Sequence, residues 1–146
     1  MLRFSYPASV TTSDDGYVVT FRDVPEAVTG GATYDEALQA AVDALAVALD
    51  GYIESGQSIP QPTPRHIEEV VVTVPPVRAG ALLLKQATVQ QSIPIHELAG
   101  RLGKTERQTR RVLSGRGSID QVITALEALG LRVEMRVVSG DQTYEN

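Results

Sequence analysis

The sequence predicts an α+β protein in which a small sheet-and-helix unit is followed by an all-helical unit with a short closing strand. Three observations lead to this fold class. Apolar residues alternate along the first part of the 146-residue chain, they recur at helical spacing along the second part, and the charge changes sign between the two. Hydrophobic residues at 42% and charged residues at 21% are typical of globular proteins. We expect a boundary after Pro75-Pro76, giving domains of residues 1–76 and 77–146.

The charge distribution is uneven although the net charge is only −5. Residues 1–76 have three basic and eleven acidic residues, whereas residues 77–146 have ten basic and seven acidic ones. Two modules with different partners are the natural interpretation. The chain has no cysteine, which excludes disulfides and thiolate metal sites. No segment has the length of a membrane span or the features of a secretory signal, so a cytoplasmic protein without membrane contact is expected.

The first elements are expected to form a β-hairpin. Alternation over residues 2–12 predicts one strand, and residues 17–22 a second. Asp15-Gly16 between them is typical of a tight primed turn, whose central residues require positive φ. Pro25 ends the second strand, and Gly30-Gly31 is interpreted as a loose connection.

A long helix and a third strand should complete this unit. Thr33 and Glu36 have the spacing of a capping box, and apolar residues three and four apart continue to Ser55-Gly56. Alternate prolines from 60 to 64 predict an extended connector. The nearly apolar run 68–74 then predicts a strand that is central in the sheet or covered on both faces.

The second unit is predicted to contain four helices, at residues 79–90, 94–102, 105–113 and 118–129. Capping boxes at Thr105/Gln108 and Ser118/Gln121 mark the starts of the last two. Ala99, four residues before a turn glycine at Gly103, has the spacing of two crossing helices in a helix-turn-helix.

The third of these helices should have a basic outward face. Six basic residues and one acid lie between residues 101 and 116, and most of them point away from the core-facing positions. A solvated charged face is the alternative, but the second helix of a helix-turn-helix is the element that enters a major groove. We therefore expect DNA binding by Lys104, Thr105, Glu106, Arg107, Gln108, Arg110, Arg111 and Arg116.

The segment from Leu98 to Leu113 also resembles the Xre or phage-repressor type of helix-turn-helix, although Lys104 and Thr109 occupy positions that are commonly apolar in it. That resemblance implies that Glu106, Arg107 and Arg110 read bases. Arginine pairs with guanine, and glutamate accepts a hydrogen bond from cytosine.

The end of the chain alternates from residue 131 to 138 and predicts a strand with one apolar face. Because an all-helical unit offers this strand no partner, we expect it to pair with its twin in a dimer or higher oligomer. The alternative is packing on the N-terminal sheet. The dimerisation residues would be Leu131, Val133, Met135 and Val137.

Catalysis is not expected. The N-terminal acids fall in turns, loops and a helix start rather than in mid-strand, where a metal-dependent nuclease fixes its carboxylates. His66 and His96 have no second histidine at ligand spacing and are interpreted as surface residues. We therefore expect no enzyme activity, no metal and no cofactor. The acids would instead form a solubilising surface or one that meets a basic partner.

The N-terminal sequence resembles the HicB antitoxin family. Four features support the resemblance: the loop Asp23-Val24-Pro25, the helix start Gly31-x-Thr33, the pair Glu36-Ala37, and Ile59-Pro60-x-Pro62 after the helix. Glu26 and Gly30 depart from the family, which commonly has glycine and a polar residue at these places. The resemblance extends over nearly the whole chain, since members with a C-terminal helix-turn-helix share this domain order.

The resemblance implies a partial RNase H-like N-terminal fold without nuclease activity. This unit would bind and mask a HicA-type mRNA-cleaving toxin, and the C-terminal unit would repress the operon by binding operator DNA. Asp14, Asp15, Asp23 and Glu26 are the expected toxin-binding residues. Two alternatives stay open: a regulator whose N-terminal unit senses a small molecule, and a residual metal-dependent nuclease.

Overall fold

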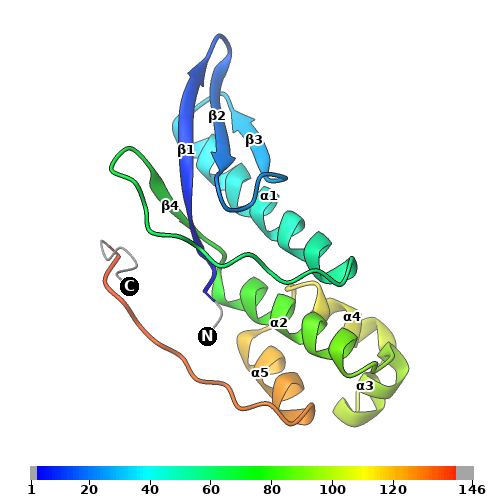
Figure 1. Ribbon diagram of the computed structural model, residues 1–146. Helices are drawn as coiled ribbons and strands as arrows, with labels where there is room; N and C mark the ends of the chain where they lie inside the picture. The colour runs from blue at the N-terminus through cyan, green and yellow to red at the C-terminus, as the bar shows by residue number, and fades with distance from the viewer. Residues whose placement is uncertain (1–2, 141–146) are drawn as a thin grey trace. The chain divides into compact units, whose positions relative to one another are not determined.

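The computed structural model describes residues 3–140. These residues pack as two compact units, one formed by residues 3–52, 58–74 and 138–140 and the other by residues 53–57 and 75–137. The first contains a four-stranded antiparallel sheet and a long helix, and the second contains four shorter helices (Figure 1). The predicted α+β class is confirmed.

The sheet has the strand order β3-β2-β1-β4. Its central hairpin joins β1 (Ser5–Ser13) to β2 (Gly16–Phe21), as predicted. The prediction for the turn is wrong. Ser13 pairs with Gly16, so the loop is Asp14-Asp15, and neither aspartate has positive φ. Gly16 has φ 147° and lies so close to β3 that a Cβ there would be 2.2 Å from the Gly31 carbonyl oxygen.

The strand β3 (Val28–Gly31) was not predicted, because Gly30-Gly31 was interpreted as a loose connection. It pairs antiparallel with β2, from Tyr17 opposite Gly31 to Thr20 opposite Val28. The glycines are required by close packing rather than by flexibility. A Cβ on Gly30 would be 2.5 Å from the Tyr17 carbonyl oxygen, and one on Gly31 would be 2.5 Å from the Ala37 nitrogen.

The strand β4 (Val70–Thr73) lies at the edge of the sheet next to β1. The prediction of a central or doubly covered strand is therefore wrong. Val72 is buried, but Val71 is 40% exposed, so only one face of β4 packs against the core. Because valines occupy both faces of β4, its sequence does not distinguish an edge strand with one buried face from a strand that is buried on both faces.

The helix α1 (Tyr34–Glu54) lies across one face of the sheet (Figure 1). The predicted capping box is present: the Glu36 N–H donates to the Thr33 hydroxyl at 3.2 Å, and the Thr33 N–H donates to the Glu36 carboxylate at 3.3 Å. Its packed face carries Ala37, Ala41, Leu45 and Leu49, all of them completely buried. Alanines on this face let the helix backbone approach the sheet closely.

An ion pair between the exposed Arg22 and the buried Glu69 fastens the connector between α1 and β4 to the end of β2. Arg22 donates to Glu69 at 2.7 Å, and Glu69 also accepts a 2.7 Å hydrogen bond from the His66 N–H. Glu69 is only 6% exposed. Arg22 further donates to Thr63 and to the Pro64 carbonyl oxygen, so one guanidinium holds three parts of the connector.

This ion pair predicts acid sensitivity. The hydrogen bond from Arg22, helped by the His66 N–H and opposed by desolvation, holds the pKa of Glu69 below its ordinary value of 4.5. Its stabilisation is therefore complete above pH 4.5 and is lost as the pH falls through the lowered folded-state pKa. We expect Glu69→Gln to lower the free energy of unfolding at pH 7 by about 1.5 kcal/mol and to flatten the loss in acid, as measured by urea denaturation. The exposed neighbour Glu68→Gln should do neither.

The second unit contains α2 (Pro76–Gln90), α3 (Ile95–Leu102), α4 (Glu106–Leu113) and α5 (Ile119–Ala128), so all four predicted helices are confirmed. Their core includes Leu84, Leu98, Val112 and Val122, each at most 2% exposed. The predicted capping boxes at the starts of α4 and α5 are both formed.

The predicted closing strand is absent from the described chain, since residues 131–139 have no regular secondary structure. Val133 packs partly against the core of the second unit, whereas Leu131, Met135 and Val137 are 41%, 72% and 93% exposed. The alternating sequence is extended but has no strand beside it among the described residues, and a strand is defined by its pairing. Pairing of these residues with a second copy of the chain therefore stays a prediction.

Candidate nucleic-acid interface

The start of α4 is fixed by the turn that precedes it. Gly103 has φ 62°, the left-handed conformation that ends α3, as predicted from its position. Thr105 then caps α4: its hydroxyl accepts from the Gln108 N–H at 3.1 Å, while the Gln108 side chain accepts from the Thr105 N–H at 2.9 Å. Among the predicted DNA-binding residues, Thr105 and Gln108 thus use their side chains to hold the helix start.

One face of α4 packs into the core of its unit through Thr109 and Val112, which are 0% and 2% exposed. A buried hydroxyl normally requires a hydrogen-bond partner. Thr109 donates to the Thr105 carbonyl oxygen at 2.9 Å, so the polar side chain at this commonly apolar position is satisfied within its own helix. Threonine in place of the commonly apolar residue at position 109 therefore does not disturb the packing of α3 against α4.

The opposite face of α4 is basic and slightly hollowed. A shallow depression of about 480 Å³ is lined by Arg107, Gln108, Arg110, Arg111, Ser114 and Arg116. Four of these six residues are arginines, and none is acidic. All four guanidinium groups are on exposed residues, where a ligand can reach their N–H donors. Planar guanidinium groups donate in pairs to phosphate oxygens or to a guanine edge, which makes this surface suited to a nucleic acid.

Ser114 belongs to this surface but was missed by the sequence analysis. It lies at the end of α4, seven residues after Arg107 and four after Arg110, and therefore on the same helical stripe. The helical spacing of the arginines already indicates that residue 114 lies on the same helix face.

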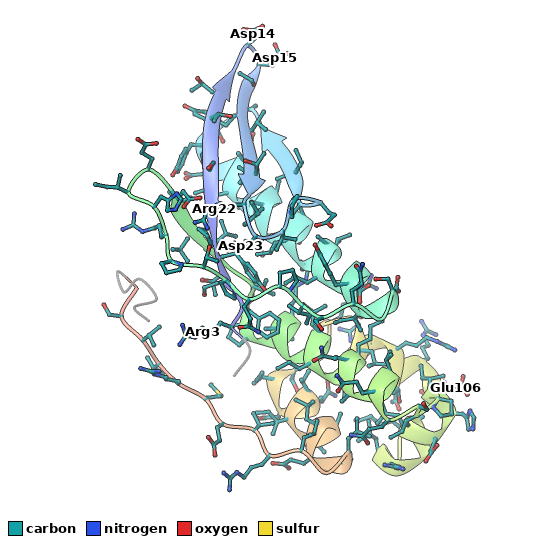
Figure 2. The ribbon with its side chains drawn as sticks, in the orientation of Figure 1. Arg3, Asp14, Asp15, Arg22, Asp23 and Glu106 are labelled. Carbon is teal, nitrogen blue, oxygen red and sulfur yellow. The ribbon has the colours of Figure 1, made fainter. Side chains whose placement is uncertain are left out.

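Two of the basic residues near this surface are paired with acids one turn earlier. Arg110 contacts Glu106 at 3.3 Å, and Arg101 contacts Glu97 at 2.8 Å. Figure 2 shows Glu106 on the outer side of α4. Both pairs are exposed, and such pairs contribute only a few tenths of a kcal/mol, so a ligand can readily replace them.

The four acids predicted to bind a protein partner are not gathered in one place. Asp14 and Asp15 are exposed at the tip of the hairpin, and Asp23 follows the other end of β2 (Figure 2). Six residues of β2 separate the two positions, which corresponds to about 20 Å. Asp23 accepts hydrogen bonds from the Thr63 N–H at 2.8 Å and its hydroxyl at 2.9 Å, and Glu26 accepts from the Tyr52 hydroxyl at 2.7 Å. Asp23 and Glu26 therefore stabilise their own unit.

The remaining candidate ligands are dispersed. His66 and His96 are both exposed, as predicted. Within residues 3–140, no three histidine, aspartate or glutamate side chains are close enough together to hold a metal ion. In the same part of the chain, no helix is both long enough and apolar enough to cross a membrane.

The fold and this surface define a class of protein in which an acidic sheet-and-helix unit is joined to a helical unit with an arginine-rich helix face. Residues 5–79 match the family described as HicB_like antitoxin of bacterial toxin-antitoxin system. The chain belongs to this HicB-like antitoxin family.

Similar proteins extend the likeness beyond the matched residues. Antitoxin HicB of Escherichia coli (strain K12) is 39% identical over 136 residues, which cover 91% of this chain and 99% of that protein. Antitoxin HicB 2 of Photorhabdus laumondii is 39% identical over 132 residues, covering 89% of this chain and 94% of the relative. Antitoxin HicB of Pseudomonas fluorescens (strain Pf0-1) is 28% identical over 137 residues, with 92% and 94% coverage. The alignments therefore include the helical unit with its arginines.

Proposed function

We propose that this protein is an antitoxin that binds and neutralises a HicA-type mRNA interferase and represses its own operon by binding operator DNA in the cytoplasm, without catalysis of its own. Membership of the HicB-like antitoxin family supports the first activity. The observation that carries the second is the arginine-lined depression on α4, in a chain whose net charge is otherwise negative.

In this proposal the two domains divide the work. Residues 1–76, as a partial RNase H-like fold, bind the toxin, and residues 77–146 bind DNA through α3 and α4 as an Xre-type helix-turn-helix. The left-handed turn at Gly103 and the buried contact of Ala99, 4% exposed, are the features expected of such a motif. The exposed face of α4 would then lie in the major groove.

Base reading is assigned to the first turns of α4. Arg107 and Arg110 would donate to guanine O6 and N7, and Glu106 would accept from cytosine once its pair with Arg110 opens. Lys104, Arg111 and Arg116 would neutralise phosphates. Thr105 and Gln108 would act mainly by holding the helix start, since their side chains are engaged in the capping box.

The DNA-binding proposal predicts a strong dependence on salt. The three phosphate contacts assigned to each protomer correspond to a slope of about −3 per protomer in a plot of log affinity against log salt concentration. Arg107→Ala should relax the preference for the operator over other sequences, whereas Arg111→Ala should weaken binding to all sequences alike. Fluorescence anisotropy with operator and scrambled duplexes measures both. Binding that does not respond to salt would contradict the proposal.

Toxin neutralisation is tested by co-expression. A HicA-type toxin should arrest growth when expressed alone, and this chain should restore growth and copurify with it. Rescue without copurification would point away from direct masking of the toxin.

We further propose that residues 131–138 form a strand by pairing with the same residues of a second copy, giving the dimer that a palindromic operator requires. The exposure of Leu131, Met135 and Val137 supports this, because pairing would remove three large apolar side chains from water. Val137→Asp should convert the dimer to a monomer in sedimentation velocity, whereas the substitution Arg136→Asp on the other face should not.

A further inference from the structure

The outer edge of β3 has backbone groups that point away from the sheet. The Val74 N–H donates to the Phe4 carbonyl oxygen. Because the backbone groups of successive residues point alternately to the two neighbouring strands, residues 4, 6 and 8 bond to β4, and residues 9, 11 and 13 bond to β2. The same alternation in β2 points the backbone groups of Tyr17 and Val19 toward β3, where they bond to Gly31 and Thr29. The N–H and C=O groups of Val28 and Gly30 therefore point outward, and no described strand lies beyond them.

Few side chains obstruct this edge. Two of the four residues of β3 are glycines, which packing against Tyr17 and the start of α1 demands. Val28, which lies opposite Thr20 on one face of the sheet, is 59% exposed. Tyr34 is 42% exposed and packs edge-to-face on Tyr17, on the other face, with ring centroids 5.8 Å apart. Edge strands are usually protected by charged side chains, proline or a covering element. β3 itself has neither a charge nor a proline, and Figure 1 shows it at the margin of the sheet with α1 behind.

The surroundings of this edge are acidic. Residues 23–64 contain seven aspartates and glutamates and no lysine, arginine or histidine. Asp35 and Glu36, in the first turn of α1, follow β3 directly. Asp14 and Asp15 occupy the turn that joins β1 to β2, the strand beside β3. Arg22, which precedes this stretch, is paired with Glu69. A partner strand that carries lysine or arginine would therefore be attracted to this edge, and an acidic one repelled.

We propose that the outer edge of β3 is the docking site for an extended, basic segment of the toxin, which adds a fifth strand to the sheet. Backbone hydrogen bonds to Val28 and Gly30 would supply affinity, the exposed Val28 side chain would contact one apolar side chain of the segment, and the acids near the Gly31 end of β3 would select a basic segment. This inference rests on the proposed toxin-binding function and assigns that function a surface. Asp14 and Asp15 belong to it as flanking charges, whereas Asp23 and Glu26 do not.

The test compares the two edges of the same sheet. The probe is the product of the short open reading frame adjacent to the gene of this chain, and its affinity is measured by calorimetry with the full-length protein. Val28→Lys places a positive charge on the proposed edge, and Val71→Lys places the same charge on β4 at the opposite edge. Val28→Pro removes the outward N–H, which does not bond to β2, and its ring also fixes φ at about −65°. Urea denaturation of each variant reports its folding.

We expect Val28→Lys and Val28→Pro to weaken binding at least tenfold and Val71→Lys to change it less than twofold. Amide exchange at Val28 and Gly30 should slow at least tenfold in the complex. A folded Val28→Lys variant that binds like the unsubstituted chain would overturn the β3 site and leave the antitoxin proposal standing. Failure of the unsubstituted chain to bind the probe would overturn the proposed function itself, and this inference with it.

Discussion

Replacing Arg107, Arg110 and Arg111 together with glutamine is expected to lower the affinity for operator DNA about a thousandfold, because each arginine that contacts a base or phosphate contributes about 1 to 3 kcal/mol. The slope of log affinity against log salt concentration should fall by about 1 in magnitude, since only Arg111 of the three is assigned to a phosphate and each lost phosphate contact removes about 0.9. The free energy of unfolding should stay nearly constant, because these side chains are exposed and the surface pair between Arg110 and Glu106 is weak.

The matched control for the triple variant is Arg136→Gln, which removes a positive charge from the same unit but away from α4. Anisotropy titrations at several salt concentrations, combined with urea denaturation, separate lost contacts from lost folding. Unchanged affinity in the triple variant would show that DNA does not bind at α4.

The second large effect is expected at Gly31 in the first unit. A Cβ there would be 2.5 Å from the Ala37 nitrogen, 2.9 Å from the Ala37 Cα and 2.9 Å from the Glu36 carbonyl carbon, all of them backbone atoms in the first turn of α1. Relieving this clash requires α1 to move from the sheet or β3 to separate from β2. We expect Gly31→Ala to lower the free energy of unfolding by about 3 kcal/mol, measured by urea denaturation.

Gly51→Ala is the control, and its effect should have the opposite sign. Gly51 is an exposed residue within α1, and a Cβ added to it would meet nothing within 4 Å. Alanine should therefore stabilise the helix by about 0.5 to 1 kcal/mol. Equal effects of the two substitutions would contradict the close approach of β3 to α1.

The helices could be predicted from the sequence because their signals are local. Three capping boxes, at Thr33, Thr105 and Ser118, are formed by residues three apart, and the left-handed turn at Gly103 depends on a single residue. The same holds for the basic face of α4: residues at spacings of three and four share a helix face wherever the helix packs. The buried Thr109 does not disturb the helix, because its hydroxyl donates to the Thr105 carbonyl oxygen one turn earlier.

The strands were predicted less well, because their pairing and burial depend on distant residues. Val28 and Thr29 are typical strand residues, but the pair Gly30-Gly31 favours a loop. Only the tertiary structure shows that these glycines lie in β3, packed against Tyr17 and Ala37. The valines of β4 did not reveal that one of its edges is open. The acids Asp23 and Glu26 resembled a binding surface in sequence, yet they bond to Thr63 and Tyr52, which lie 40 and 26 residues away.

The sequence by itself determined the two-part organisation, the places where helices begin and end, and the stripe of arginines on α4, since all of these follow from composition or from contacts within a few residues. Only the tertiary structure decided the order of the strands, which acids are engaged within the fold, and which sheet edge is open. These depend on backbone groups and side chains brought together from distant parts of the chain, and no local pattern encodes their distances. The alternation of the segment after Leu131 is likewise local, but among the described residues of the single chain it forms no strand.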